Sequence, residues 1–222
     1  MTKKLYLYSP ELGADVEVLS CREIDSGRYA VRLDVTPFYP QGGGQPSDVG
    51  SIGDAQVLHV VTENDDVIHY VNQLIPLGKA IAQVSANVRN LHSTLHSAGH
   101  LLAHVLVSQG WLAIKAHHWP GEARVVFKAS TDIPAIDLEV AAVQQLCDAA
   151  IAQDLPCKIT INENQYRQVT FGEYTPYGCG GTHVNSTGEL AGLRVVSMKF
   201  KKGQLTFNYD VEPVITSVEQ QQ

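Results

Sequence analysis

The sequence predicts an α+β protein: a small N-terminal β-barrel domain followed by an α+β domain with an antiparallel sheet and helices. Three observations support this class. Short strand-like runs fill the first 85 or so residues, a long stretch of helix formers begins near Asn87, and a second helix and several further strand-like runs follow it. The 222 residues leave room for two modest domains. We expect residues 1–86 to form the first domain and residues 87–222 the second.

Five runs of strand length lie in the N-terminal part, at residues 16–19, 29–35, 56–61, 67–71 and 80–84. Their apolar residues alternate with polar ones or run on without interruption, and turn-forming residues separate several of them, which is typical of short strands. Strands of this length and spacing favour a small all-β barrel or sandwich.

Two helices are expected in the C-terminal part. Residues 87–109 contain helix formers and no proline, and Gly110 is expected to end that helix. Residues 138–154 predict a second amphipathic helix, which Leu155-Pro156 would end. Strands are predicted at residues 123–129, 158–161, 193–200 and 204–210, the last two joined as a hairpin.

The composition narrows the class of protein. The formal net charge is −7 and the pI is near 5.7, which argues against a broad nucleic-acid surface but not against a local basic patch. Four scattered cysteines are too few for a disulfide framework, so we expect reduced thiols that are free to bind metal. No run approaches the roughly 18 apolar residues of a membrane helix, and the N-terminus does not resemble a signal peptide. We therefore expect a cytoplasmic protein without a membrane partner.

Histidines recur at every fourth position of the first predicted helix, at 92, 96, 100 and 104. Residues four apart share a helix face, with Cβ atoms about 5–6 Å apart, and two such imidazoles can bind one zinc ion. Each step of four residues turns about 40° beyond a full circle, so all four histidines cannot face one ion. The helix geometry leaves open which neighbouring pair does, and a solvated or structural histidine face is the alternative.

A glycine-rich segment, Cys179-Gly180-Gly181-Thr182-His183, offers two more ligands of the kind zinc prefers. With two helix histidines it would complete a tetrahedral set of three imidazoles and one thiolate. The alternative for Cys179 is a buried thiol beside a glycine turn. Ser97-Ala98-Gly99 stands between His96 and His100, so the glutamate of an H-E-x-x-H protease is absent.

Three motifs carry a family resemblance. Residues 96–102 resemble the HxxxH motif of alanyl-tRNA synthetase editing domains, and residues 179–190 resemble their C-x-x-x-H motif. Residues 36–50, with the run Gly42-Gly43-Gly44-Gln45, resemble the glycine-rich motif of the free-standing AlaX proteins. The chain is thus similar to AlaX-type alanyl-tRNA editing proteins, over residues 36–190.

The resemblance implies one Zn²⁺ per chain, held by His96, His100, Cys179 and His183, with His92 and His104 outside the ligand set. It implies a zinc-dependent aminoacyl-tRNA deacylase that removes serine or glycine from alanine tRNA in trans. An alanine pocket discriminates poorly against both, because a methyl group changes binding by only about 1–3 kcal/mol. No nucleotide-binding fingerprint for amino-acid activation is present in the chain.

Several residues are candidates for roles in the reaction. Thr36, Gln45 and Cys179 are the candidate catalytic residues, and Gly42, Gly43 and Gly44 are candidates for substrate binding through backbone amides. The Thr36 hydroxyl would meet the serine side chain; the alternative is a strand threonine that packs by its methyl group. Zinc would activate a water or orient the substrate. Four protein ligands are typical of structural zinc, so this choice stays open.

Candidate contacts to the tRNA are Arg89, Arg167, Lys199, Lys201 and Lys202, with a solvated charge cluster as the alternative. Three other functions remain open: a zinc hydrolase of another ester or amide, a tRNA-binding module with structural zinc, and the related editing domain of threonyl-tRNA synthetase. The glycine-rich motif favours the alanine group over the last of these. The sequence leaves the oligomeric state open.

Overall fold

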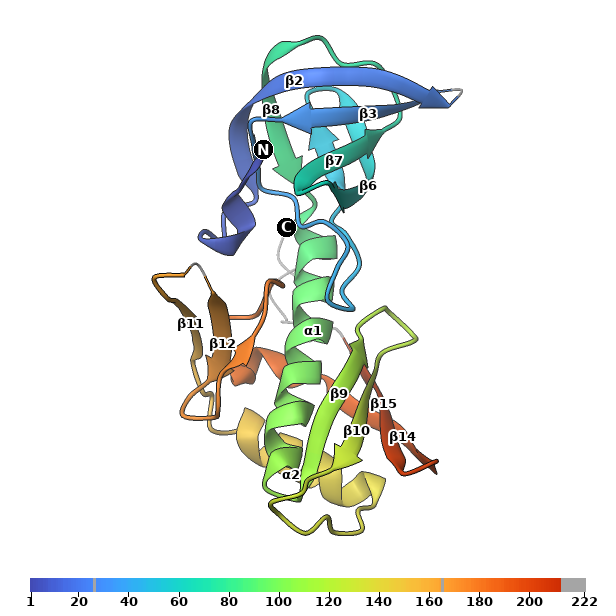
Figure 1. Ribbon diagram of the computed structural model, residues 1–222, viewed down its shortest axis with the longest axis vertical. Coiled ribbons are helices and arrows are strands. Elements are labelled where there is room, and N and C mark those ends of the chain that lie inside the picture. The colour runs from blue at the N-terminus through green and yellow to red at the C-terminus, as the bar shows by residue number, and fades with distance from the viewer. Residues whose placement is uncertain (26, 165, 213–222) are drawn as a thin grey trace, which may run out of the picture. The chain divides into compact units, whose positions relative to one another are not determined.

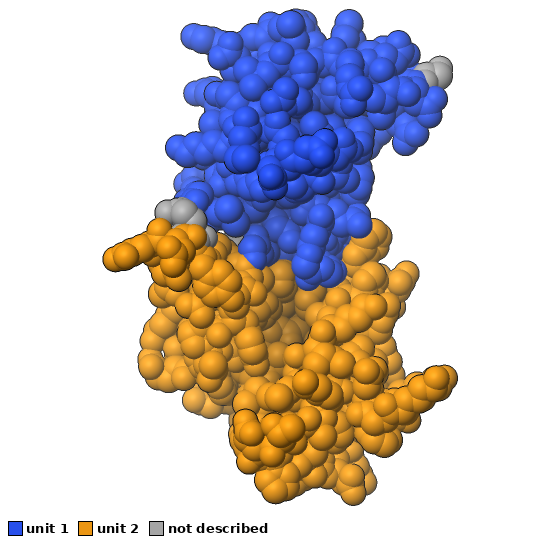
Figure 2. Space-filling model, in the orientation of Figure 1, with its two compact units in different colours: residues 1–92, 180–182 blue, residues 93–179, 183–222 orange. Residues whose placement is uncertain are grey.

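The computed structural model describes residues 1–25, 27–164 and 166–212, and Figure 1 draws its helices and strands. The chain divides into two compact units, coloured separately in Figure 2: residues 1–92 with 180–182 (unit 1), and residues 93–179 with 183–222 (unit 2). The predicted α+β class is confirmed, because the described residues form two α-helices and mostly antiparallel sheets. The Gln-rich tail, residues 219–222, lies outside the described residues.

Unit 1 is built mainly of strands. In chain order these are β1 (Lys3–Lys4), β2 (Gly13–Asp25), β3 (Arg28–Leu33), β4 (Val35–Thr36), β5 (Gly50–Ile52), β6 (Ala55–Glu63), β7 (Asp66–Val71) and β8 (Gly78–Val84), with a 3₁₀ turn at Leu5–Leu7. Six of them pair antiparallel in the order β2-β3-β7-β6-β5-β8, and β8 pairs back with β2, so this ladder closes on itself. β1 and β4 form a separate parallel pair.

The alternation seen in the sequence sets the inner face of this ring. On β2, Val16 and Val18 are buried while Asp15 and Glu17 are exposed, as expected when successive side chains point to opposite faces. The buried residues of the ring form one cluster, whose fully buried members are Val31, Leu33, Phe38, Ile52, Val60, Val67, Val71 and Ala82. Burying each of the larger ones stabilises the fold by about 1.5–3 kcal/mol.

A buried histidine, His69 on β7, lies among these apolar side chains. Its Nδ1 is 3.2 Å from the Val31 carbonyl oxygen, which can only accept, so Nδ1 carries the proton. Nε2 is then an acceptor and takes the hydroxyl proton of Thr36 at 2.7 Å. Burial lowers the pKa of His69 from 6.5 to about 4.

We expect the free energy of unfolding to fall as the pH is lowered from 6.5 to 4. In this window His69 takes up a proton in the unfolded chain but not in the folded one, so acid favours unfolding. For one residue the effect is at most about 3 kcal/mol. Urea unfolding at the two pH values should show a smaller decrease in the free energy of unfolding for His69→Gln than for the unsubstituted chain. Equal decreases would contradict the assignment. The unsubstituted chain and His69→Gln share the other histidines with lowered pKa values, so the difference between the two reports His69 alone. These shared histidines are His92, His96, His100, His104, His118 and His183.

Unit 2 combines helices with two antiparallel sheets. Its elements are α1 (Ala86–Val107, whose first residues belong to unit 1), β9 (Trp111–His117), β10 (Arg124–Ala129), α2 (Val140–Ile151), β11 (Cys157–Ile161), β12 (Arg167–Phe171), β13 (Tyr177–Gly178), a 3₁₀ turn at Thr187–Leu190, β14 (Leu193–Lys201) and β15 (Gln204–Val211). The strand orders are β14-β15-β10-β9 and β11-β12-β13.

Both helices pack against one face of the four-stranded sheet. The core cluster joins Leu102 and Leu106 of α1, Cys147 of α2, and Phe127 and Phe207 of the sheet. Apolar residues three and four positions apart form the face of α1 that packs in this core. Gly110 follows α1 with a φ of 79°, and a Cβ there would lie 2.5 Å from the Pro134 carbonyl oxygen. The chain can therefore turn directly from the helix into β9 only with glycine at this position.

The elements agree with the sequence prediction in large part. The helix predicted over residues 87–109 is α1, and the one predicted over 138–154 is the shorter α2, after which Asp154 takes a left-handed conformation with φ 48°. β1, β5, β9, β12 and β13 were not predicted. No helix in the described ranges is both long and apolar enough to cross a membrane. All four cysteines are free thiols.

Candidate metal centre

Four side chains of unit 2 bring their donor atoms together. His96, His100, Cys179 and His183 each offer one ligand atom, and these atoms all lie within 4.8 Å of one another. His96 Nε2 is 3.2 Å from His100 Nε2 and 3.4 Å from Cys179 Sγ, which is 3.3 Å from His183 Nε2. Around a tetrahedral zinc ion, two nitrogens would be about 3.3 Å apart and a nitrogen and a sulfur about 3.6 Å apart. The donor set and its spacing therefore fit zinc.

The three imidazoles of this group are in the form that binds metal. Burial lowers the pKa of His100 to about 3 and the pKa values of His96 and His183 well below their usual range, and neighbouring imidazoles add to the effect. The rings are therefore neutral at pH 7. A neutral ring keeps one nitrogen lone pair, which a metal ion requires.

Ser97 sets the orientation of one ligand. Its Oγ accepts the backbone N–H of Val184 at 3.1 Å and lies 3.3 Å from His183 Nδ1. A proton on Nδ1 can bond to this oxygen, which leaves the Nε2 lone pair of His183 directed at Cys179 and the other ligands. Hydrogen bonds of this kind fix the tautomer and the ring orientation of metal-binding histidines.

We expect Ser97→Ala to weaken zinc binding by about 10–100-fold, the usual effect of removing such a partner. Competition with a chromophoric chelator would measure the affinity. Ser108→Ala is the matched control. Ser108 directly follows the same helix, and its hydroxyl donates to the Val105 carbonyl oxygen instead of contacting a ligand. Equal zinc affinities for the two variants would show that Ser97 does not hold His183.

The two other helix histidines lie outside the ligand group. His104 stacks between Tyr174 and Tyr177, with ring centroids 4.9 Å apart in each pair. His92 is buried near Asp48 and Arg89. Both findings agree with the expectation that only the central pair, His96 and His100, meets Cys179 and His183.

His118 was not among the predicted site residues. It follows β9 and stacks on His96 with ring centroids 4.5 Å apart. The Tyr209 hydroxyl donates to the Leu95 carbonyl oxygen at 2.9 Å, so it accepts a proton from His118 Nδ1 at 2.5 Å. Gly99 makes room for this ring, because a Cβ there would lie 2.3 Å from His118 Cε1. His118 Nε2 thus keeps a lone pair, on a ring that stacks against the ligand His96.

The predicted tRNA contact at Arg167 is wrong. Arg167 is 8% exposed, and its Nη1 donates to the Cys179 carbonyl oxygen at 2.6 Å. The Cys179 N–H in turn donates to the Arg167 carbonyl oxygen at 3.1 Å. The guanidinium therefore anchors the backbone at the thiolate ligand and is not available to RNA.

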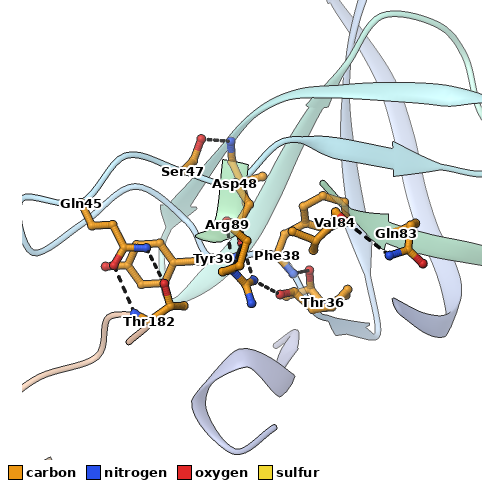
Figure 3. Close-up of polar contacts among 12 residues, drawn as sticks. Thr36, Phe38, Tyr39, Gln45, Ser47, Asp48, Gln83, Val84, Arg89 and Thr182 are labelled. Atoms are coloured by element: carbon orange, nitrogen blue, oxygen red, sulfur yellow. Dashed lines mark hydrogen bonds and ion pairs between the residues drawn. The ribbon is translucent and has the colours of Figure 1, made fainter. Parts of the chain in front are cut away.

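Arg89 is likewise wrongly predicted as a tRNA contact. It is 8% exposed and forms an ion pair with the fully buried Asp48 (Figure 3). Its Nη2 also donates to the Pro37 carbonyl oxygen at 2.7 Å, and the Asp48 carboxylate accepts the Tyr39 N–H at 2.6 Å. This pair fixes the chain where it enters the glycine-rich segment.

The glycine-rich segment of unit 1 is a tight turn. The N–H of Gly42 donates to the Gln45 carbonyl at 3.1 Å, and the Gln45 N–H donates back at 2.8 Å. Gly43 and Gly44 have φ values of 55° and 81°, the conformation of a two-residue type I′ turn, which strongly favours glycine. The structure therefore accounts for these glycines through the turn, and their binding of substrate stays a prediction.

The Gln45 side chain, which is fully buried, is paired with Thr182 (Figure 3). Gln45 Nε2 donates to the Thr182 hydroxyl at 2.8 Å, and the Thr182 N–H donates to Gln45 Oε1 at 3.1 Å. Thr182 directly precedes His183 in the chain. Gln45 thus holds the segment that joins the two loop ligands.

The Thr36 side chain is also fully buried. Its hydroxyl donates to His69, as described above, and accepts the Phe38 N–H at 3.1 Å. One lone pair of this hydroxyl remains, so a hydrogen bond with a substrate hydroxyl would have to be accepted by Thr36, and this contact stays a prediction.

Comparison with curated proteins gives three informative relatives, and no family model matches the chain. An alanine–tRNA ligase of Pyrobaculum neutrophilum is 30% identical over 215 residues, which cover 78% of this chain and 23% of the ligase. The alanyl-tRNA editing protein Aarsd1-B of Xenopus laevis is 25% identical, covering 80% of this chain and 48% of that protein. The alanyl-tRNA editing protein AlaX-M of Methanosarcina mazei is 26% identical, covering 90% of this chain and 92% of that protein.

The chain therefore spans about a quarter of the ligase, about half of Aarsd1-B and nearly all of AlaX-M. These matches confirm the resemblance that the three motifs indicated: the chain is a homologue of the AlaX-type alanyl-tRNA editing proteins and of part of the alanine–tRNA ligases.

Proposed function

We propose that this chain is a trans-editing hydrolase that removes serine or glycine from mischarged alanine tRNA at a zinc site. The group of four donor atoms within 4.8 Å carries the proposal, because its ligands come from two of the motifs that resemble the editing family. The names of Aarsd1-B and AlaX-M, both alanyl-tRNA editing proteins, support the substrate class.

The reaction would be hydrolysis of the ester between the amino acid and the terminal ribose. His96, His100, Cys179 and His183 would hold the zinc, which supplies a Lewis acid when bound. Gln45 would act as a positioning residue, since both the nitrogen and the oxygen of its side-chain amide are hydrogen-bonded to Thr182. Thr36 would accept a hydrogen bond from the hydroxyl of a serine substrate.

We further propose that residues 1–86 and 87–222 are the two domains of the enzyme. The closed six-stranded ring of unit 1 would be the predicted N-terminal barrel. The second domain would contribute all four zinc ligands.

Deacylation assays test the proposed function. Alanine tRNA charged with serine, glycine or alanine is incubated with the protein, before and after treatment with a zinc chelator. We expect rapid release of serine or glycine, little release of alanine, and loss of activity on chelation. Release of none of the three by folded, zinc-loaded protein would refute the proposal.

A second candidate function is a tRNA-binding module with structural zinc. The complete set of four protein ligands favours it, because catalytic zinc usually keeps an open position. Such a module would bind alanine tRNA and hydrolyse none of the charged forms. A third outcome, hydrolysis of model esters without tRNA dependence, would indicate a zinc hydrolase of another ester.

A further inference from the structure

The four-stranded sheet of unit 2 has one face turned to solvent. Its strands follow the order β14-β15-β10-β9 (Figure 1). Its other face carries the buried side chains Val125, Phe127, Leu205, Phe207 and Tyr209, which pack in the core with α1 and α2. Because successive residues of a strand alternate between faces, the residues between these point away from the core.

The strand register defines this outer face as three rows of four residues. The rows are Lys201, Gln204, Lys128 and Leu112; Lys199, Thr206, Val126 and Lys115; and Ser197, Asn208, Arg124 and His117. Each row crosses from β14 through β15 and β10 to β9.

Five of these twelve positions are basic and none is acidic. We call Lys115, Arg124, Lys128, Lys199 and Lys201 the basic face. All four lysines are exposed, and within the described ranges no ion pair joins them to a carboxylate. This contrasts with the formal net charge of −7 for the whole chain. Neither packing in the core nor internal ion pairing accounts for the lysines.

The size and chemistry of the basic face suit a polyanion. With strands about 4.8 Å apart and about 3.3 Å per residue, the three rows span roughly 14 by 13 Å. The neutral residues among the lysines include Gln204, Thr206, Asn208 and Ser197, whose side chains can hydrogen-bond to phosphate and ribose oxygens. At one edge the indole of Trp119 stacks on His117 with ring centroids 5.7 Å apart. Polar and aromatic groups among the lysines favour RNA over an anionic membrane surface, which amphipathic helices more often recognise.

We propose that the basic face binds the sugar-phosphate backbone of tRNA. The identity of the RNA rests on the proposed function, whereas the location of the binding surface rests on the register of the sheet. The basic face also explains how a protein with a negative net charge can bind a polyanion, because positive charge is concentrated on one face of the sheet.

The test compares two variants of the full chain with equal loss of charge. The first carries Lys115→Gln, Lys128→Gln, Lys199→Gln and Lys201→Gln. The control carries Lys3→Gln, Lys4→Gln, Arg22→Gln and Lys79→Gln, all in unit 1. Binding of an unacylated alanine tRNA transcript is measured by fluorescence anisotropy over a range of salt concentrations. Circular dichroism and zinc content check the fold.

We expect the basic-face variant to lose affinity by about tenfold or more at 0.1 M salt, while the control loses much less. The slope of log K against log salt is negative, and its magnitude should decrease by about 3–4, since each lost phosphate contact contributes about 0.9. Deacylation by this variant should show a raised KM and an unchanged kcat. These results would support the basic face as the docking surface.

Equal affinities and slopes for the two variants would overturn the proposal, even if deacylation of mischarged tRNA is intact and the proposed function stands. Binding through the basic face without deacylation would support the docking surface and refute the function. Binding of the unsubstituted protein to phosphatidylserine vesicles but not to the transcript would overturn the proposal in favour of a lipid surface.

Discussion

Replacing His96 with alanine is expected to abolish zinc binding and lower deacylation by about 10³-fold or more. His96 is 3% exposed, and its Nε2 lies within 3.4 Å of both His100 Nε2 and Cys179 Sγ. Losing it leaves at most three ligands. A metal ion stabilises the charge of an ester-hydrolysis transition state by several kcal/mol, and about 4 kcal/mol corresponds to 10³ in rate.

Zinc content and the rate of serine release from mischarged tRNA would be measured on the same preparation. The control is His92→Ala, a histidine of the same helix and on the same spacing that lies outside the ligand group. It should keep both zinc and activity. If His96→Ala retained full activity, or if both variants lost it equally, the assignment of the ligand pair would be wrong.

The second large effect is expected from Asp48→Asn, which should lower the free energy of unfolding by about 3–5 kcal/mol. Asp48 is fully buried and paired with Arg89, which is 8% exposed. Removing one partner of a buried ion pair leaves the other charge without compensation in a medium that solvates it poorly. The asparagine keeps the size of the side chain, so the charge itself is tested.

Urea unfolding followed by circular dichroism would measure the loss. Glu173→Gln is the matched control, because it removes the carboxylate of the exposed ion pair with Lys158 and should leave the unfolding midpoint unchanged. A midpoint for Asp48→Asn as high as that of the control would show that the buried pair does not stabilise unit 1.

The sequence predicts those parts of the fold that local patterns determine. α1 follows from its helix formers, and the strands β2, β3, β6, β7 and β8 follow from their apolar runs. The ligand group follows from the resemblance to the editing family, because the spacing of the helix histidines alone leaves open which pair joins Cys179 and His183. Short-range patterns are sufficient for the helix and the strands, whereas the pairing of His96 and His100 with Cys179 and His183 depends on the family motifs, because the two pairs are far apart in the chain.

Contacts between distant residues that no family motif marks were not predicted. His118 meets His96 only because Gly99 leaves room and Tyr209 orients the ring. Arg89 and Arg167 were interpreted as surface charges, although Arg89 pairs with Asp48, 41 residues away, and Arg167 with the Cys179 carbonyl, 12 residues away.

The basic face shows the same limit. Lys199 and Lys201 were predicted to contact RNA. Only the pairing of β14, β15, β10 and β9 brings Lys115, Arg124 and Lys128 onto the same face.

A zinc titration of the metal-free protein tests the central claim most directly. Protein stripped by a chelator would receive increasing zinc, and serine release from mischarged alanine tRNA would be measured at each step. We predict that activity rises in proportion to bound zinc and reaches a plateau at one equivalent per chain. Full activity of the stripped protein, or no activity with one equivalent bound, would contradict a zinc-dependent editing site.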